Sequence, residues 1–323
     1  MKIAITWDYE LFFGERSGSV EKCMLEPTNR LLEIAAKNKA KFTFFVDAGM
    51  LALGEKEAAF HSELSHIKQQ ISTWDDTGHE IGLHIHPHWE DAIWKEGWQF
   101  DLRRYKLADF SQHEIETIFD SYHGVLQNLT KHKISSYRAG GWCIQPFSKL
   151  KSSFLKHQLK IESSIFQGGK NTTSPYNYDF AKAPIKEKWH FENHECEESA
   201  NGKFLEIPIA SQTYSPLFFW KLFILGRLFP KKHKSIGNGN PAKGGGSRKD
   251  FLTKYNHLCV SADGYFVTQI EKAIREAEQK GWESLVIIGH PKACTVFSLN
   301  YLDKLISKLS KKHEFVCLKD LAK

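Results

Sequence analysis

Two kinds of hydrophobic pattern alternate along the chain. Short runs rich in β-branched and aromatic residues predict strands, and longer stretches with helical spacing separate them. The predicted strands are 2–7, 41–46, 79–84, 133–139, 203–210, 284–290 and 314–318. The predicted helical stretches are 27–39, the polar segment that ends near Asp76, and 111–131. Such repeated strand–helix units predict parallel strands joined by helical crossovers, in a barrel or a wound sheet.

One helix start is marked clearly. Ser111 is followed three residues later by Glu114, the spacing of a capping box, so a helix is expected to begin at Ser111.

Composition narrows the class of protein. Of the 323 residues, 41% are hydrophobic and 25% are charged, values typical of a soluble globular protein and not of a disordered one. The net charge of +6 is too small and too scattered to predict a nucleic-acid partner. We expect one domain over residues 1–323, with a flexible Gly-rich loop at about 235–250.

The cysteines and the N-terminus bear on location. Six scattered cysteines without a CxxC pair predict reduced thiols and a cytoplasmic protein. The first residues, MKIAITWDYELFFGERSG, do not resemble a signal peptide, because acidic residues interrupt the short apolar stretch. A membrane span is not expected either, because no apolar run reaches about 18 residues.

Candidate catalytic residues follow the predicted strands, where sites are built in α/β barrels and wound sheets. Asp8 and Glu10, in T-W-D-Y-E, come at the end of the first strand. Residues two apart on a strand project to the same side, so this pair suits a metal ligand beside a general base. Taken alone, two solvent-facing acids are the stronger interpretation.

The most informative stretch is GHEIGLHIHPHWED, residues 78–91. Within it, His84 and His88 are spaced i, i+4 and could share one face of a helical turn to chelate a metal ion. If the strand continues instead, His84 and His86 form the same-face pair. Three histidines within five residues favour a metal site over a structural cluster.

Two further clusters follow later strands. Arg138 stands in Y-R-A-G-G-W, where it could orient a neighbouring carboxylate, although a surface Arg before a glycine turn is an equally good interpretation. His290 follows an apolar strand in I-I-G-H-P and is a candidate general acid.

In this order, the four clusters resemble the NodB-homology polysaccharide deacetylases (carbohydrate esterase family 4), which remove N-acyl groups from amino sugars. The resemblance runs from residue 1 to about 290 and implies a distorted, incomplete (β/α) TIM-like barrel. It also implies roles: Glu10, His84 and His88 as metal ligands, Asp8 as base, Arg138 as its partner and His290 as acid. Substrate contacts would come from His86, Gly140, Gly141 and Trp142.

The chain departs from the family pattern in three places. D-Y-E replaces the usual adjacent Asp-Asp, and Gly-Gly-Trp replaces Pro-Tyr after the Arg. The family also has an Asp that tunes the late His, and the only candidates for it that we identify are Asp179 and Glu206.

The implied cofactor is one divalent metal ion. One carboxylate and two imidazoles suit Zn²⁺ best, and Co²⁺, Fe²⁺, Mn²⁺ or Ni²⁺ also fit. The implied substrate is an N-acetyl or N-formyl amino sugar, carried on a nucleotide or a lipid, in the synthesis of a lipopolysaccharide or capsule.

Three alternatives remain open from sequence. A metal-dependent amidohydrolase or phosphatase would use His84 and His86 as its metal pair. A non-haem Fe(II) oxygenase would use the same residue types, but usually in an antiparallel β fold. A non-catalytic carbohydrate-binding relative is disfavoured, because the base and acid positions are both filled.

The segment 216–234 is strongly apolar and then basic. One interpretation is peripheral contact with the inner face of a membrane, with cations facing anionic lipids. The other, stronger on sequence alone, is a buried helix whose Lys and Arg side chains extend to solvent.

Overall fold

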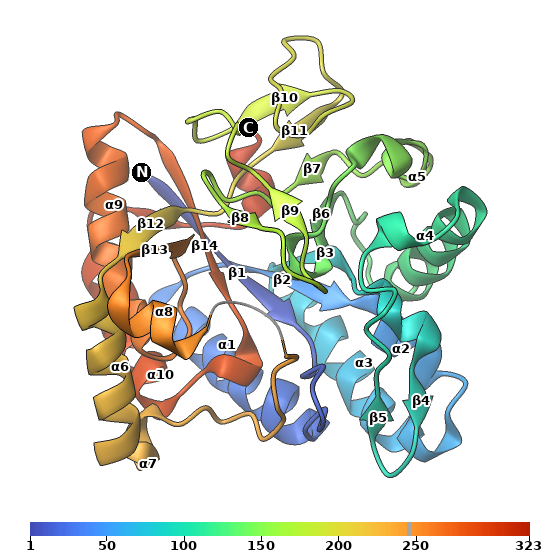
Figure 1. The fold of residues 1–323 in the computed structure, drawn as a ribbon, viewed down its shortest axis with the longest axis horizontal. Helices are drawn as coiled ribbons and strands as arrows, with labels where there is room; N and C mark the ends of the chain where they lie inside the picture. Colours follow the sequence, from blue (N-terminus) through green and yellow to red (C-terminus); the bar gives the residue numbers. More distant parts are fainter. Residues whose placement is uncertain (244–246) are drawn as a thin grey trace.

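A curled sheet forms the centre of the molecule in the computed structural model, which describes residues 1–243 and 247–323 (Figure 1). Along this sheet the strand order is β10-β11-β7-β6-β3-β2-β1-β14, and β15 also pairs with β1. The strands from β7 to β14 are parallel, and only β10 joins antiparallel, to β11. The strands of this sheet are β1 Lys2–Tyr9, β2 Phe42–Asp47, β3 Glu80–Ile85, β6 Ser136–Ala139, β7 Ile161–Glu162, β10 Trp189–Phe191, β11 Phe204–Glu206, β14 Ser284–Gly289 and β15 Glu314–Phe315.

Single bridges bring the two ends of this sheet together. Ile209, three residues after β11, makes parallel bridges with Phe166 and with Val286 of β14. The sheet therefore curls into an incomplete barrel, and the predicted distorted (β/α) barrel is confirmed.

Helices surround the sheet, with α2 to α5 on the right of Figure 1 and α1, α9 and α10 on the left. The capping box predicted at the start of α4 is present, because Ser111 and Glu114 exchange hydrogen bonds. The helices are α1 Glu26–Asn38, α2 Ala48–Gly54, α3 His61–Asp76, α4 Gln112–Gln127, α5 Lys151–His157, α6 Pro216–Leu228, α7 Pro230–His233, α8 Arg248–Thr253, α9 Ile270–Gln279 and α10 Val296–Leu309.

Three short antiparallel pairs lie outside the main sheet, and sequence patterns did not predict them. They are β4 Ile93–Trp94 with β5 Trp98–Gln99, β8 Lys170–Asn171 with β9 Tyr178–Asp179, and β12 Ser211–Tyr214 with β13 Asn256–Cys259. Strands this short carry too few residues for an alternating pattern.

The central strands are buried on both faces. Every residue of β2, β3 and β14 is buried, which explains their nearly continuous apolar sequences. Buried polar side chains lie at both ends of the central strands, and those at the carboxyl ends build the candidate site.

Part of the Gly-rich stretch is held close to the strand ends. Backbone hydrogen bonds join Ile236 to Cys294, Gly237 to Lys292 and Asn240 to Arg16. A Cβ atom on Gly237 would lie 2.4 Å from the Lys292 carbonyl oxygen, so only glycine allows this approach. The prediction of a flexible loop is therefore wrong for its first part, residues 235–240, which the structure shows as a hydrogen-bonded segment. Residues 244–246 of that loop lie outside the described residues.

Over the described residues, none of the helices combines the length and apolarity that crossing a bilayer would require. All six cysteines are free thiols, as their spacing predicted.

Candidate metal centre and active site

The carboxyl ends of four parallel strands bring the predicted residues to one cavity. Asp8 and Glu10 come from the end of β1, His84 from β3 and Arg138 from β6, and His290 directly follows β14. The cavity measures about 850 Å³, and Asp8, Glu10, His84, His86 and His290 are among its lining residues. The sequence order of the motifs thus becomes a spatial cluster.

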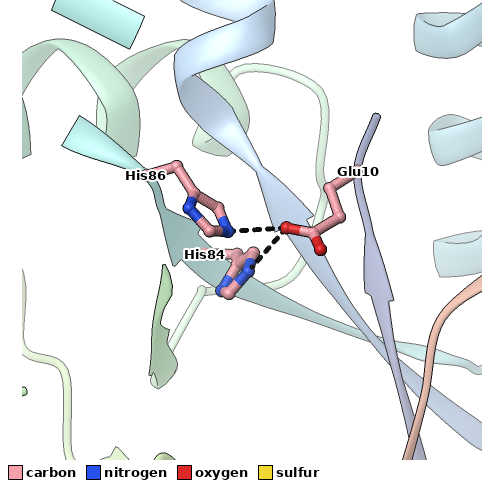
Figure 2. Close-up of side chains that lie close together, drawn as sticks. All are labelled: Glu10, His84 and His86. Atoms are coloured by element: carbon pink, nitrogen blue, oxygen red, sulfur yellow. Dashed lines mark hydrogen bonds and ion pairs between the residues drawn. The ribbon is translucent and has the colours of Figure 1, made fainter. Parts of the chain in front are cut away.

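Glu10 is the centre of this cluster. Its Oε2 atom lies 3.2 Å from His84 Nε2 and 2.6 Å from His86 Nε2, so both imidazoles face one carboxylate oxygen (Figure 2). All three side chains are buried, and their ligand atoms lie within 4.8 Å of one another. One carboxylate and two imidazoles converging in this way could hold a divalent metal ion.

The tautomer of His84 fits a metal ligand. Its Nδ1 donates to the backbone carbonyl of Arg138 at 2.8 Å, which leaves the Nε2 lone pair directed at the cavity. Burial opposes the charged imidazole, but Asp8, Glu10 and Asp47 outweigh it and raise the pKa of His84. This cluster of negative charge around an imidazole is also what would attract a cation.

Among the described residues, His86 Nδ1 has no hydrogen-bond partner, and His86 Nε2 faces Glu10 Oε2 at 2.6 Å. Burial is the main reason that its pKa falls to about 4, so the ring is neutral and its lone pair is available. A Cβ atom on Gly140 would lie 2.4 Å from His86 Nδ1, so glycine at 140 makes room for the ring. Gly140, expected to contact substrate, is therefore placed against His86 instead.

The expected His84–His88 pair is not what the structure brings together. His84 lies in β3 and His86 continues its extended backbone, whereas a 3₁₀ helix begins only at Pro87. The i, i+4 geometry of a helical turn is therefore absent over 84–88, and the strand alternation that pairs His84 with His86 applies.

His88 instead occupies an aromatic pocket. Its ring stacks on Tyr105 with centroids 5.2 Å apart and meets Phe13 edge-on at 4.6 Å. Burial holds the pKa of His88 well below its usual range. Its ring also lies edge-on to His86, with centroids 5.1 Å apart, and Trp89, the next residue, donates to Asp47 at 2.6 Å.

Asp8 is held by Arg138. The guanidinium Nη1 donates to Asp8 Oδ1 at 2.7 Å and to Thr6 Oγ1 at 2.9 Å, and Nε donates to the Ser163 carbonyl at 2.7 Å. Arg138 is 0% exposed, so the alternative of a surface Arg is wrong. The other oxygen, Asp8 Oδ2, lies 4.0 Å from His84 Nε2 and 3.7 Å from His290 Nε2, between the two imidazoles.

His290 has a carboxylate partner that the sequence analysis missed. Asp263 accepts from the backbone N–H of His290 at 2.7 Å and lies 2.8 Å from its Nδ1. Burial opposes protonation, but Asp263 outweighs it and raises the pKa of His290 to about 9. The imidazole is therefore charged at neutral pH, as a general acid requires.

Neither earlier candidate for that partner contacts His290. Asp179 pairs with Lys170 at the surface, and Glu206 is buried beside Glu162. Asp263 follows β13 in S-A-D-G, and a bridge from Ser261 to Ile288 places it beside His290. The available signal was an Asp shortly after an apolar run. We did not predict the strand, β13, that precedes it.

Lys292 is a second residue that we missed. Its ammonium lies 2.8 Å from Glu10 Oε1 and donates to the Leu11 carbonyl at 2.6 Å. Burial would raise the pKa of Glu10, but Lys292 and the two imidazoles hold it well below its usual range. The lysine binds Oε1 and leaves Oε2 to the histidines.

A family comparison covers the first three motifs. The model described as polysaccharide deacetylase matches residues 2–145, a little less than half of the chain. Residues 2–145 are therefore similar to the polysaccharide deacetylase family. The match ends before His290, so the acid position rests on the geometry above. No curated protein matches the sequence.

Two solved structures share the fold over nearly the whole chain. A candidate polysaccharide deacetylase from Mycobacterium smegmatis aligns with a TM-score of 0.56 and 13% identity, covering 99% of this chain and 88% of that one. The 4-alpha-glucanotransferase from Thermococcus litoralis aligns with a TM-score of 0.51 and 9% identity, covering 99% of this chain and 38% of that one. At these identities the similarity concerns the fold alone.

Aromatic side chains line the cavity beyond the charged centre. They are Phe12, Phe13, Tyr105, Trp142, Phe166, Tyr176, Tyr178, Phe251 and Tyr255. Gly141 lines it too, with φ +58°, and a Cβ atom there would lie 2.6 Å from Tyr105 Oη. Trp142 and Gly141 thus lie where substrate contacts were expected.

Proposed function

We propose that the chain is a metal-dependent hydrolase that removes an N-acetyl or N-formyl group from an amino sugar. The observation that carries the proposal is the convergence of three paired groups on one cavity. These are Asp8 with Arg138, Glu10 with the two imidazoles, and His290 with Asp263. Base, metal ligands and acid are then all within reach of one amide bond.

The residues present fit a divalent ion. Glu10, His84 and His86 are buried and their ligand atoms converge, and His86 Nδ1 has no hydrogen-bond partner among the described residues. Zn²⁺ suits this set best, with Co²⁺, Fe²⁺, Mn²⁺ and Ni²⁺ as alternatives. Such an ion would polarise the amide carbonyl and make a water molecule more acidic.

The chain's own side chains then move the protons. Asp8 Oδ2 accepts a proton from the water that attacks the acyl carbon, while Arg138 holds Oδ1 in place. As the C–N bond breaks, His290 Nε2 donates its proton to the departing amine. Asp263 holds His290 in its charged form and fixes its orientation. The products are a carboxylate and a free amino sugar.

The cavity fits a sugar. Its volume of about 850 Å³ lies in the range of ligand pockets, and its aromatic walls surround a few polar groups. Six free thiols support a reducing compartment, so we further propose a cytoplasmic precursor of a surface polysaccharide, carried on a nucleotide or a lipid.

One observation favours a second candidate function, that of a metal-dependent amidohydrolase or phosphatase. The His84–His86 pair is the one that a metal-dependent amidohydrolase or phosphatase would use, and it is the pair nearest Glu10. The family match over residues 2–145 favours the deacylase. The oxygenase alternative has lost support, because the sheet is mostly parallel.

The test is a substrate screen with the metal-loaded protein. N-acetyl and N-formyl amino sugars, free, nucleotide-linked and lipid-linked, are scored for amine release, and sugar phosphates for phosphate release. We expect amine release, and Asp8→Asn should remove it. Phosphate release without amine release would overturn the proposal in favour of the second candidate.

A further inference from the structure

Helix α6 carries an apolar stripe on its outer face. Leu217, Trp220, Ile224 and Leu228 are 63%, 45%, 46% and 66% exposed, and Phe229, just beyond the helix, is 52% exposed. Steps of three and four residues place the first four on one side of the helix. We call these five residues the α6 stripe.

The opposite face of α6 holds the helix to the protein. Phe218 and Phe219 are buried with Tyr214, and Phe219 packs on Phe251 of α8 with centroids 4.9 Å apart. The interpretation of 216–234 as a buried helix whose Lys and Arg side chains extend to solvent therefore holds for one face of α6 only. The buried face holds α6 to the protein, and the side chains of the α6 stripe are exposed. Helix α6 lies at the left edge of the molecule in Figure 1.

Only positive charge accompanies the stripe in the sequence. Residues 216–249 contain no Asp or Glu. The exposed cations of this region are Lys221, Arg227, Lys231, Lys232, Lys234, Lys243, Arg248 and Lys249. A second copy of the chain would bring like charges together, whereas an anionic surface would be attracted.

We propose that the α6 stripe and its surrounding cations dock the protein on an anionic lipid bilayer. Aliphatic and aromatic side chains at half exposure can enter the interfacial region, while lysines and arginines reach the headgroups. The helix has 13 residues, too few to span a bilayer, so contact would be confined to one surface.

The same region forms one wall of the active-site cavity. Ser247, Asp250, Phe251 and Tyr255 line the cavity, and α8 lies directly against α6. Trp220 of the stripe donates to the Leu252 carbonyl of α8 at 3.1 Å. Docking would therefore bring the cavity next to the lipid surface. Resting on the proposed function, this favours an amino sugar carried on a lipid over one carried on a nucleotide.

The test is co-sedimentation with phosphatidylcholine vesicles that contain rising fractions of phosphatidylglycerol. Wild-type protein should bind more tightly as the anionic fraction rises and less tightly as salt is added. Leu217→Ser/Ile224→Ser/Leu228→Ser should weaken binding by about tenfold or more. Its matched control is Ile93→Ser/Leu155→Ser/Ile185→Ser, three exposed aliphatic residues elsewhere, which should bind as the wild type does.

The cations are tested separately. Lys231→Gln/Lys232→Gln should weaken binding to anionic vesicles by about tenfold, whereas Lys311→Gln/Lys312→Gln, an exposed pair elsewhere, should have little effect. Negligible binding by wild-type protein would overturn the proposal, and so would equal binding by the stripe variant. Loss of a dimer in the stripe variant, without vesicle binding by the wild type, would assign the stripe to self-association.

Docking and activity have separate readouts. Amine release from a free amino sugar should be unchanged in the stripe variant, and release from a lipid-linked one in vesicles should fall. Vesicle binding without any amine release would leave the docking surface standing and reject the proposed function. If wild type and stripe variant release amine equally from the lipid-linked sugar, docking through the α6 stripe does not deliver that substrate.

Discussion

The two sides of the cavity are built by different means. On the strand side, Arg138, His84 and Asp8 are 0%, 1% and 4% exposed and are fixed by several hydrogen bonds each or by neighbours in the sheet. On the opposite side, α8 has no buried residue and Tyr255 is 73% exposed. The buried strand ends therefore fix the positions of the charged side chains. The exposed α6–α8 wall is less constrained, and it can affect which molecules reach the cavity.

The sharpest test of the strand side compares the two neighbouring histidines. His86→Ala should lose the metal and with it all turnover, because it removes one of three converging ligand atoms. His88→Phe should keep the metal, since His88 packs only among aromatic rings. Elemental analysis of the purified proteins decides, and metal lost from the His88 variant but not from the His86 variant would restore the original ligand pair.

The next largest effect is expected from replacing Asp8, the proposed general base. Asp8→Asn should lower turnover by about 100- to 10,000-fold with the metal retained, because a neutral amide cannot accept the proton. Glu10→Ala should lose metal and turnover together. Steady-state kinetics and metal content are measured on the same samples. An Asp8→Asn protein that is metal-free would exchange the two carboxylate roles.

Gly140→Ala tests the packing behind the metal ligands. The new methyl group would displace His86, so metal affinity should fall by about 10- to 100-fold, as when a supporting residue is lost. Competition with a chelator measures the affinity. Unchanged affinity would mean that the His86 ring can move without cost to the site.

Asp263→Asn tests the acid through its pH profile. His290 must be protonated to act, and Asp263 raises its pKa to about 9, so activity should decline as pH rises through that value. Without the carboxylate the pKa of His290 falls, so the alkaline limb should move to lower pH and the rate near pH 8 should drop by about tenfold. An unmoved alkaline limb would show that His290 is not the titrating acid.

The smallest effect is expected on the α6–α8 side. Gly226, in the interior of α6, has open space around the position of a Cβ atom. Gly226→Ala should therefore raise the free energy of unfolding by up to about 1 kcal/mol, by favouring the helix, and leave metal binding unchanged. Denaturant unfolding measures it. A loss of stability would place that face of α6 in contacts that its exposure does not show.

The sequence predicted the strand side well because each motif follows a long, buried strand. Asp8, Arg138 and His290 were all placed correctly at one edge, since parallel strands end together. The expected His84–His88 pair differs from the His84–His86 pair that converges on Glu10, because residues 84–88 could be taken as a helical turn or as a strand. In the structure the strand conformation continues to His86, and a 3₁₀ helix begins at Pro87. The local sequence does not determine where this change occurs.

The remaining errors have a common cause. Asp263 and Lys292 reach the site through short segments that no periodicity marks, and their partners are 27 and 282 residues away in sequence. The exposure of α6 also depends on tertiary packing. An apolar helix has the same sequence whether its second face is covered or bare.

The pairing of Lys292 with Glu10 has a consequence for anions. Asp8, Glu10 and Asp263 are each matched by one cation, namely Arg138, Lys292 and the charged His290. Each of these three pairs is thus electroneutral, and on the proposed function a bound divalent ion would add two positive charges beside them. Carboxylates, including the acetate or formate just released, would then be drawn back to the loaded site. On the proposed function, retained product would then slow turnover, and acetate buffers should compete with substrate.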